Sequence, residues 1–118
     1  MSEPDLNAAV RRVLIGDNKV CGLTRQQDVV VAWQNGAVYG GLIFAEGSPR
    51  QVDETQASAL ISEAPLKFVG VFRNQSIESV AGLATRLNLA AVQLHGDEDA
   101  DYIRALRPQL PSTTAIWK

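Results

Sequence analysis

Apolar residues recur along this chain with two different spacings, and the two spacings alternate from one end to the other. Short, nearly continuous apolar runs occupy residues 39–44, 66–72 and 89–95. Between them lie longer segments in which apolar residues stand three or four positions apart, as on one face of a helix. A short apolar run bounded by turn residues is typical of a strand covered on both faces. The alternation therefore predicts parallel strands separated by helices.

Helix ends are marked along the first half of the chain. Two pairs of residues have the spacing of a capping box: Thr24 with Gln27, and Asp53 with Gln56. They predict helices over 25–35 and 53–63, and Gly36 is a typical residue after a helix end. An earlier helix is predicted over 4–15, where Leu6, Ala9, Val10, Val13 and Leu14 have helical spacing. Gly16 is its expected stop.

Two more helices are expected after the third and fourth strands. Asn74 or Ser76 is the expected cap of a helix that runs to about Leu87. The next helix should begin within the GDEDAD segment, whose carboxylates we expect to be exposed to solvent and favourable near the positive end of the helix dipole. The final apolar segment, TTAIWK, predicts a fifth strand.

Four strand–helix pairs followed by a fifth strand indicate an α/β fold with a mainly parallel sheet. A flavodoxin-like sheet has five parallel strands and would be complete within 118 residues. A (βα)8 TIM barrel has eight strands and about 250 residues, so this chain would form a partial barrel of four βα units and a fifth strand. Periodicity does not choose between them. A last strand with no helix after it favours the partial barrel.

Composition excludes several functional classes. The chain is 46% hydrophobic and 20% charged, as in ordinary soluble globular proteins. A formal charge of −2 gives no reason to expect a nucleic-acid or membrane partner. The single cysteine cannot form an internal disulfide. No apolar run has the length of a membrane span or a signal peptide, and the expected compartment is the cytoplasm.

Chemically versatile residues follow the predicted strands. Cys21 ends the first strand, Arg50 lies in the loop after the second, Arg73 follows the third, and His95 ends the fourth. The carboxyl ends of parallel strands gather on one face, so we expect these side chains to converge. A guanidinium holds a carboxylate with two hydrogen bonds. A thiolate is a competent base if its pKa is lowered by a helix starting directly after it.

Each of these residues also has an ordinary structural interpretation. A lone cysteine in an apolar strand more often packs in the core. Arg50, after Ser48 and Pro49, is typical of a solvated loop, and His95 could simply bond to a neighbouring loop. The sequence has no GxGxxG or Walker loop, and one cysteine with one histidine does not give a zinc-site spacing.

Four motifs in order resemble the first four strands of phosphoribosylanthranilate isomerase: KVCGLT, GGLIF followed by SPR, FVGVFRN and AAVQLHG. The similarity runs over 18–118. The preceding segment, PDLNAAVRRVLIG, resembles the closing helix of indole-3-glycerol-phosphate synthase, which is fused to the isomerase in bifunctional enzymes. The resemblance implies a linker helix at 1–17 and the N-terminal half of an isomerase barrel at 18–118.

The resemblance also implies a reaction. The family catalyses an Amadori rearrangement of N-(5-phosphoribosyl)anthranilate in tryptophan biosynthesis, by general acid–base catalysis without a metal or organic cofactor. The family's catalytic base is the cysteine of the CGLT motif, which is Cys21 here. Its carboxylate-binding arginine corresponds to Arg50, and the histidine lining its pocket to His95. Gln93 points the same way as His95, because side chains alternate along a strand.

The sequence departs from the family where the general acid and phosphate site are concerned. The acid is an aspartate on a strand beyond the fifth, and no aspartate here matches it; the phosphate site belongs to the seventh and eighth strands. We therefore expect this chain alone to be almost inactive, and to self-associate or to bind the C-terminal half of the barrel. The alternatives are a self-contained flavodoxin-like binding or regulatory domain and an inactive half-barrel assembly module.

Overall fold

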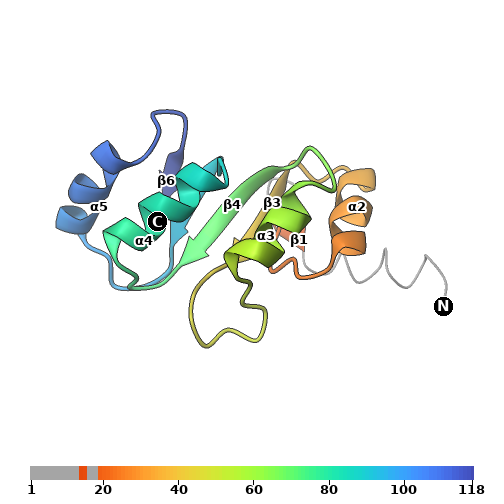
Figure 1. The fold of residues 1–118 in the computed structure, drawn as a ribbon, viewed down its shortest axis with the longest axis horizontal. Helices are drawn as coiled ribbons and strands as arrows, with labels where there is room; N and C mark the ends of the chain where they lie inside the picture. The colour runs from red at the N-terminus through yellow and green to blue at the C-terminus, as the bar shows by residue number, and fades with distance from the viewer. Residues whose placement is uncertain (1–13, 16–18) are drawn as a thin grey trace.

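A computed structural model describes Leu14–Ile15 and residues 19–118 of the chain. Figure 1 shows one sheet whose strands alternate with helices. The strands are β1 (Leu14–Ile15), β2 (Lys19–Val20), β3 (Tyr39–Ile43), β4 (Lys67–Phe72), β5 (Ala91–Leu94) and β6 (Ala115–Trp117). The helices are α2 (Gln26–Gln34), α3 (Glu54–Ile61), α4 (Ile77–Arg86), α5 (Ala100–Leu106) and the short 3₁₀ helix η1 (Arg107–Gln109). The five predicted strands and the helices between them are confirmed.

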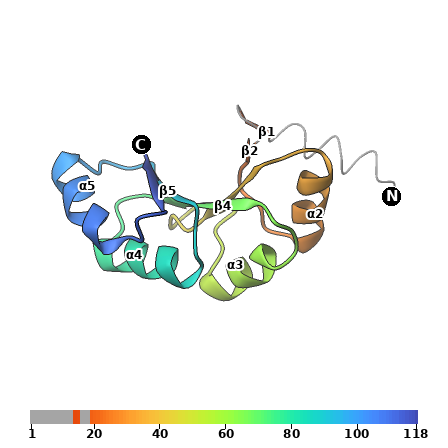
Figure 2. The same ribbon diagram turned by 90° about the horizontal axis from the view of Figure 1, so that it is seen from above.

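Strand order distinguishes between the two predicted architectures. β2 to β6 are parallel and lie side by side in the order in which they occur along the chain. A flavodoxin-like sheet has the order 2-1-3-4-5 and helices on both faces. Figure 2 shows α2, α3, α4 and α5 following an arc on the same side of the sheet. The flavodoxin-like alternative is therefore wrong, and the arrangement is that of a partial barrel.

The main core lies between the sheet and this arc of helices. Its largest fully buried side chains include Leu42, Phe72 and Leu94 from the strands and Leu60 and Leu106 from the helices. Strand neighbours of these residues point to the opposite, concave face, because side chains alternate along a strand. The concave face therefore carries the polar side chains that approach the carboxyl ends of β2, β4 and β5.

Helix caps follow the sequence prediction at two of the three positions where a cap was expected. At α3, Asp53 accepts a hydrogen bond from the backbone N–H of Gln56 at 2.8 Å, and the Gln56 side chain accepts one from the Asp53 N–H at 3.0 Å, so the capping box is confirmed. At α4, Ser76 is the cap rather than Asn74. Asn74 instead adopts a positive φ of 56° in the preceding turn.

The capping box predicted for Thr24 and Gln27 is wrong. The N-cap residue of α2 is Arg25, and no side chain caps it. This shift of one residue places Asp28 in the first helical turn, where its carboxylate contacts the Arg25 guanidinium at 3.2 Å. A negative charge in the first turn is favourable to the helix dipole. Asp28 therefore stabilises the helix start in place of Thr24.

Only two residues of the predicted amino-terminal helix can be compared with the structure. The helix predicted over 4–15 and its stop at Gly16 lie outside the described residues, apart from Leu14 and Ile15. These two form β1, which pairs antiparallel with β2, so the helix prediction is wrong there. The backbone groups along the outer edge of β2 require hydrogen-bond partners, and β1 supplies them.

No helix within 14–15 and 19–118 combines the length and apolar character needed to cross a membrane.

Candidate active site

Side chains from four strand ends surround one pocket at the carboxyl edge of the sheet. The pocket has a volume of about 390 Å³ and its polar walls include Cys21, Ser48, Arg73 and His95. Ile43 and Val71 add an apolar floor, and the loop after β3 contributes Ala45 to Pro49. The structure thus brings Cys21 and His95 together, as the topology predicted, although 74 residues separate them in the sequence.

Cys21 is held by its neighbours on β3. The backbone N–H groups of Gly22 and Leu23 both donate to the carbonyl of Gly41, each at 3.1 Å. A Cβ atom on Gly41 would lie 3.0 Å from the Cα and 3.1 Å from the Sγ of Cys21, so Gly41 leaves the room that this thiol occupies. Cys21 is half-buried. α2 begins at Gln26, one residue after the predicted start and five residues beyond Cys21.

Arg50 lies beside Cys21 but outside the walls of the pocket. Its side chain crosses Gly22 so closely that a Cβ atom there would be 2.6 Å from Arg50 Cδ. Gly22 also has a φ of 77°, in the left-handed region that favours glycine. Arg50 is exposed, and no described carboxylate forms an ion pair with it. Its guanidinium is available to an anion next to the thiol.

Gln93 does not line the pocket. Its side chain contacts the imidazole of His95, which does. Gln93 Oε1 accepts a hydrogen bond from the ammonium group of Lys19, and Gln93 Nε2 lies 2.9 Å from His95 Nε2. An ammonium group only donates, so the amide oxygen faces Lys19 and the amide NH₂ donates to the imidazole. His95 Nε2 is then the acceptor, and the ring proton is on Nδ1.

Arg73 also lines the pocket, as its place after the third predicted strand indicated, although the resemblance assigned it no role. Its Nη2 donates to the carbonyl of Glu46 at 3.1 Å, and its backbone N–H donates to the side chain of Gln75 at 3.0 Å. Gln75 in turn donates to the carbonyl of Phe44 at 3.2 Å. These bonds join the loops after β3 and β4.

Glu98 is buried below this edge of the sheet, so the prediction that all GDEDAD carboxylates are exposed is wrong for this residue. Only 6% of Glu98 is exposed, and it precedes Asp99, the true cap of α5. Burial alone would raise the pKa of the Glu98 carboxyl. Hydrogen bonds from the backbone of Asn74, Glu98 itself and Gly96, and one from Lys118, outweigh burial and hold the pKa below its usual range.

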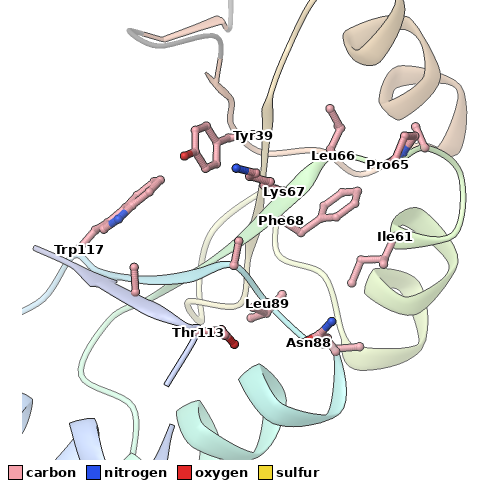
Figure 3. A pocket seen from close by; sticks show the side chains of 14 residues that line it. Tyr39, Ile61, Pro65, Leu66, Lys67, Phe68, Asn88, Leu89, Thr113 and Trp117 are labelled. Carbon is pink, nitrogen blue, oxygen red and sulfur yellow. The ribbon is translucent and has the colours of Figure 1, made fainter. Parts of the chain in front are cut away.

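A larger pocket, of about 680 Å³, lies at the opposite ends of the strands (Figure 3). Its walls include Tyr39, Lys67, Phe68 and Trp117, with the Tyr39 and Trp117 rings edge to face at 5.3 Å between centroids. None of its lining residues is a cysteine, histidine or carboxylate. It contains none of the residues that the sequence predicted for the site, and active sites of barrel enzymes lie at the carboxyl ends of the strands, so the smaller pocket is the candidate active site.

Within the described part of the chain, no three His, Cys, Asp or Glu residues are grouped so that they could hold a metal ion.

Comparisons with curated proteins give close relatives. The tryptophan biosynthesis protein TrpCF of Yersinia pestis is 64% identical over all 118 residues, and that of Salmonella typhi is 58% identical over the same length. The aligned region is 25% of the first protein and 26% of the second. The chain thus spans about a quarter of the length of the curated relatives it matches.

Solved structures show the same fold. Phosphoribosylanthranilate isomerase from Thermus thermophilus is 34% identical, with a TM-score of 0.73 over 83% of this chain and 49% of that one. An isomerase in complex with reduced 1-(o-carboxyphenylamino)-1-deoxyribulose 5-phosphate is 30% identical, with a TM-score of 0.75 over 83% and 50%. The partial TIM barrel prediction is confirmed.

A comparison with protein families matches residues 18–118 to N-(5′-phosphoribosyl)anthranilate (PRA) isomerase. This segment includes every strand end that contributes to the pocket around Cys21. The resemblance carried by the four sequence motifs is therefore confirmed, and the chain belongs to the phosphoribosylanthranilate isomerase family.

Proposed function

We propose that this chain provides one half of the active site of a phosphoribosylanthranilate isomerase in tryptophan biosynthesis. The substrate would be N-(5-phosphoribosyl)anthranilate, and the product the carboxyphenylamino-deoxyribulose 5-phosphate. The observation that carries the proposal is the position of Cys21, the chain's single thiol, in one pocket with Arg73 and His95. The similar isomerase solved with a reduced form of that product supports this choice of ligand.

The proposed reaction has two proton transfers that side chains catalyse, followed by ketonisation. Protonation of the ribose ring oxygen breaks its bond to the first carbon and gives a Schiff base with the anthranilate nitrogen. A base then removes the proton from the second carbon, and the electron pair neutralises the Schiff base as a carbon–carbon double bond forms. The resulting enolamine becomes the ketone when its first carbon gains a proton and its hydroxyl group loses one. Each transfer by a well-placed side chain accelerates the reaction typically about 10²–10⁴-fold.

Cys21 is the proposed base for the second proton transfer. As a thiolate, it would take the proton from carbon, which leaves a neutral thiol. Arg50, whose side chain crosses Gly22 beside Cys21, would hold the anthranilate carboxylate with two hydrogen bonds. His95 presents Nδ1–H as a donor, because its Nε2 already accepts from Gln93. These roles place the aromatic end of the substrate near β2 and β3.

Other parts of the reaction are assigned outside these 118 residues. The chain covers 48% of the isomerase solved from Thermotoga maritima and 50% of the isomerase solved with the reduced product. The proposed general acid and phosphate site belong to the portion of the barrel that this chain does not span. The concave face of the sheet would pair with that portion or, in the isolated chain, with a second copy.

The bifunctional arrangement is also part of the proposal. The TrpCF relatives are about four times longer than the segment they share with this chain. Residues 1–17 would then connect an indole-3-glycerol-phosphate synthase domain to the isomerase barrel that begins at residue 18. The proposed compartment is the cytoplasm, which the similarity to tryptophan biosynthesis proteins supports.

A chimaera tests the proposal directly. The 118 matching residues of the Yersinia pestis TrpCF protein are replaced by this chain, which is 64% identical. The purified chimaera should consume N-(5-phosphoribosyl)anthranilate at a rate similar to that of the unmodified relative. A correctly folded chimaera that retains other activities of the relative but has no isomerase turnover would contradict the proposal.

A further inference from the structure

Glu98 is a buried carboxylate to which the proposed reaction assigns no role. Its side chain is only 1% exposed, and it lies in the loop between β5 and α5. Removing a carboxylate from water is costly unless hydrogen bonds and charges replace its hydration. The contacts of Glu98 therefore show what the fold gains from keeping a charge at this position.

Both carboxylate oxygens accept hydrogen bonds from loop backbone. Glu98 Oε2 accepts from the N–H of Asn74 at 2.7 Å, and Oε1 accepts from the N–H of Gly96 at 2.8 Å. Lys118 Nζ lies 3.4 Å from Oε1 and donates to the carbonyl of Gly96 at 2.8 Å. One side chain thus connects the loop after β4, the loop after β5 and the residue after β6.

The two bridged loops also fit closely against each other. Asn74 Oδ1 accepts a hydrogen bond from the N–H of Asp97 at 2.7 Å, so the connection between the loops is reciprocal. A Cβ atom on Gly96 would lie 2.4 Å from Asn74 Oδ1, so any larger residue would displace the Asn74 side chain from its present place. Glycine at position 96 is therefore required for this approach.

The backbone groups that Glu98 holds are next to the pocket. Asn74 directly follows Arg73, and Gly96 directly follows His95. Arg73 and His95 both line the pocket that contains Cys21. A shift of either loop would therefore move a charged or imidazole side chain relative to the thiol.

We propose that Glu98 is a positioning residue, whose carboxylate fixes the distance between Arg73 and His95 by bonding to the backbone of Asn74 and Gly96. The inference rests on the proposed function of this pocket, because the spacing of Arg73 and His95 matters only if both act on one ligand. Glu98 itself does not contact the substrate. Its effect on turnover is transmitted by the two loops.

The test compares Glu98→Gln with Asp101→Asn in the chimaera. Glutamine has nearly the same shape, but one acceptor oxygen becomes an NH₂ donor, so one of the two backbone N–H groups loses its partner. Asp101 belongs to the same acidic segment, is exposed and contacts only Arg104 among the described residues. Asp101→Asn therefore controls for the loss of a charge nearby.

We expect Glu98→Gln to lower kcat/KM by up to about 10²-fold, because misplacement of a site by about 1 Å has effects of this size. Its affinity for the reduced product analogue should fall as well. The His95 ring resonance, assigned by its loss in His95→Gln, should shift in NMR spectra recorded well below the melting temperature. Asp101→Asn should leave all three quantities unchanged.

Wild-type kcat/KM and an unmoved His95 resonance in Glu98→Gln would overturn the proposal. The proposal would also be overturned if the His95 resonance of Glu98→Gln did not move and its loss of activity were explained by the unfolded fraction of the protein. If Glu98→Gln does not fold, Glu98→Asp keeps the charge but is one methylene too short to bond to both loops, and a His95 resonance that stays in place there also overturns the proposal. A chimaera that carries no substitution and shows no turnover would instead reject the proposed function. The His95 resonance would still test whether Glu98 holds the two loops.

Discussion

Cys21 and Arg50 are adjacent in space, but the structure gives them different surroundings. The thiol is half-buried against Gly41 and faces the pocket. It therefore does not belong to the main core between the sheet and the helices. Arg50 is exposed and lies across Gly22. A base must reach the proton on the reacting carbon, whereas an arginine that binds the substrate carboxylate can act from the border of the site. The two residues should therefore affect different kinetic constants.

Cys21→Ala in the chimaera should lower kcat by at least about 10²-fold, because it removes the proposed base. The melting temperature should change little, since the thiol is only partly buried and alanine fits the same space. Thr24→Ala, an exposed change three residues away, is the control. Turnover near that of the control would assign Cys21 to structure alone.

Arg50→Ala should raise KM by about ten- to a hundredfold with a smaller change in kcat, since a charge-assisted hydrogen-bond pair contributes about 1.5–3 kcal/mol. Arg50→Lys should recover only part of the loss, because an ammonium group does not match a carboxylate with two parallel bonds. Arg25→Ala removes another exposed arginine and serves as control. An unchanged KM in Arg50→Ala would argue against the carboxylate clamp.

Helix starts in this chain depend on which side chain reaches the first free backbone N–H groups. α3 has the reciprocal bonds of Asp53 and Gln56, whereas α2 begins one residue later than Thr24 requires. Both segments have the same sequence spacing, so the spacing alone does not determine the cap. The difference between them can be measured as stability.

Asp53→Ala should destabilise the chain by about 1 kcal/mol, the usual cost of losing an N-cap side chain. Thr24→Ala should cost much less, because Thr24 caps nothing. Denaturant unfolding of both variants, with equal m-values, measures the two differences. Equal destabilisation by the two substitutions would mean that Thr24 also caps α2.

The order and type of the elements could be predicted from the sequence because each apolar run is bounded by glycine, proline or capping residues. The convergence of Cys21 and His95 followed from topology. Glu98 was misread because its buried partners, the backbone N–H groups of Asn74 and Gly96, have no side-chain signal in the sequence. For the same reason, the support of His95 by Gln93 and Lys19 required coordinates.

At the scale of the whole molecule, the sheet is an arc with helices on its convex side (Figure 2). Two carboxyl groups, those of Glu98 and Glu54, make the free energy of unfolding depend on pH. Glu98 and Glu54 both have lowered pKa values, Glu98 mainly because backbone hydrogen bonds overcome burial, and Glu54 through its hydrogen bonds to Arg86. A carboxylate with a lowered native pKa stabilises the fold above its unfolded pKa and loses that contribution as the pH falls.

The unfolding free energy should therefore be constant with respect to these two groups well above pH 4.5, the ordinary value for glutamate, and decrease as the pH falls below it. Glu98→Gln should make this decrease shallower, because the amide does not titrate. Denaturant unfolding at a series of pH values measures both slopes. A variant whose slope equals that of the original chain would show that Glu98 is not linked to acid unfolding.

The pocket between Cys21, Arg73 and His95 is proposed to receive the sugar and anthranilate parts of one ligand. A crystal structure of the chimaera with the reduced product analogue tests it most directly. We predict that the second sugar carbon lies within van der Waals contact of Cys21 Sγ, with the anthranilate carboxylate bonded to Arg50. An analogue bound with its second carbon away from the thiol, or in the pocket around Tyr39 and Trp117, would contradict the account.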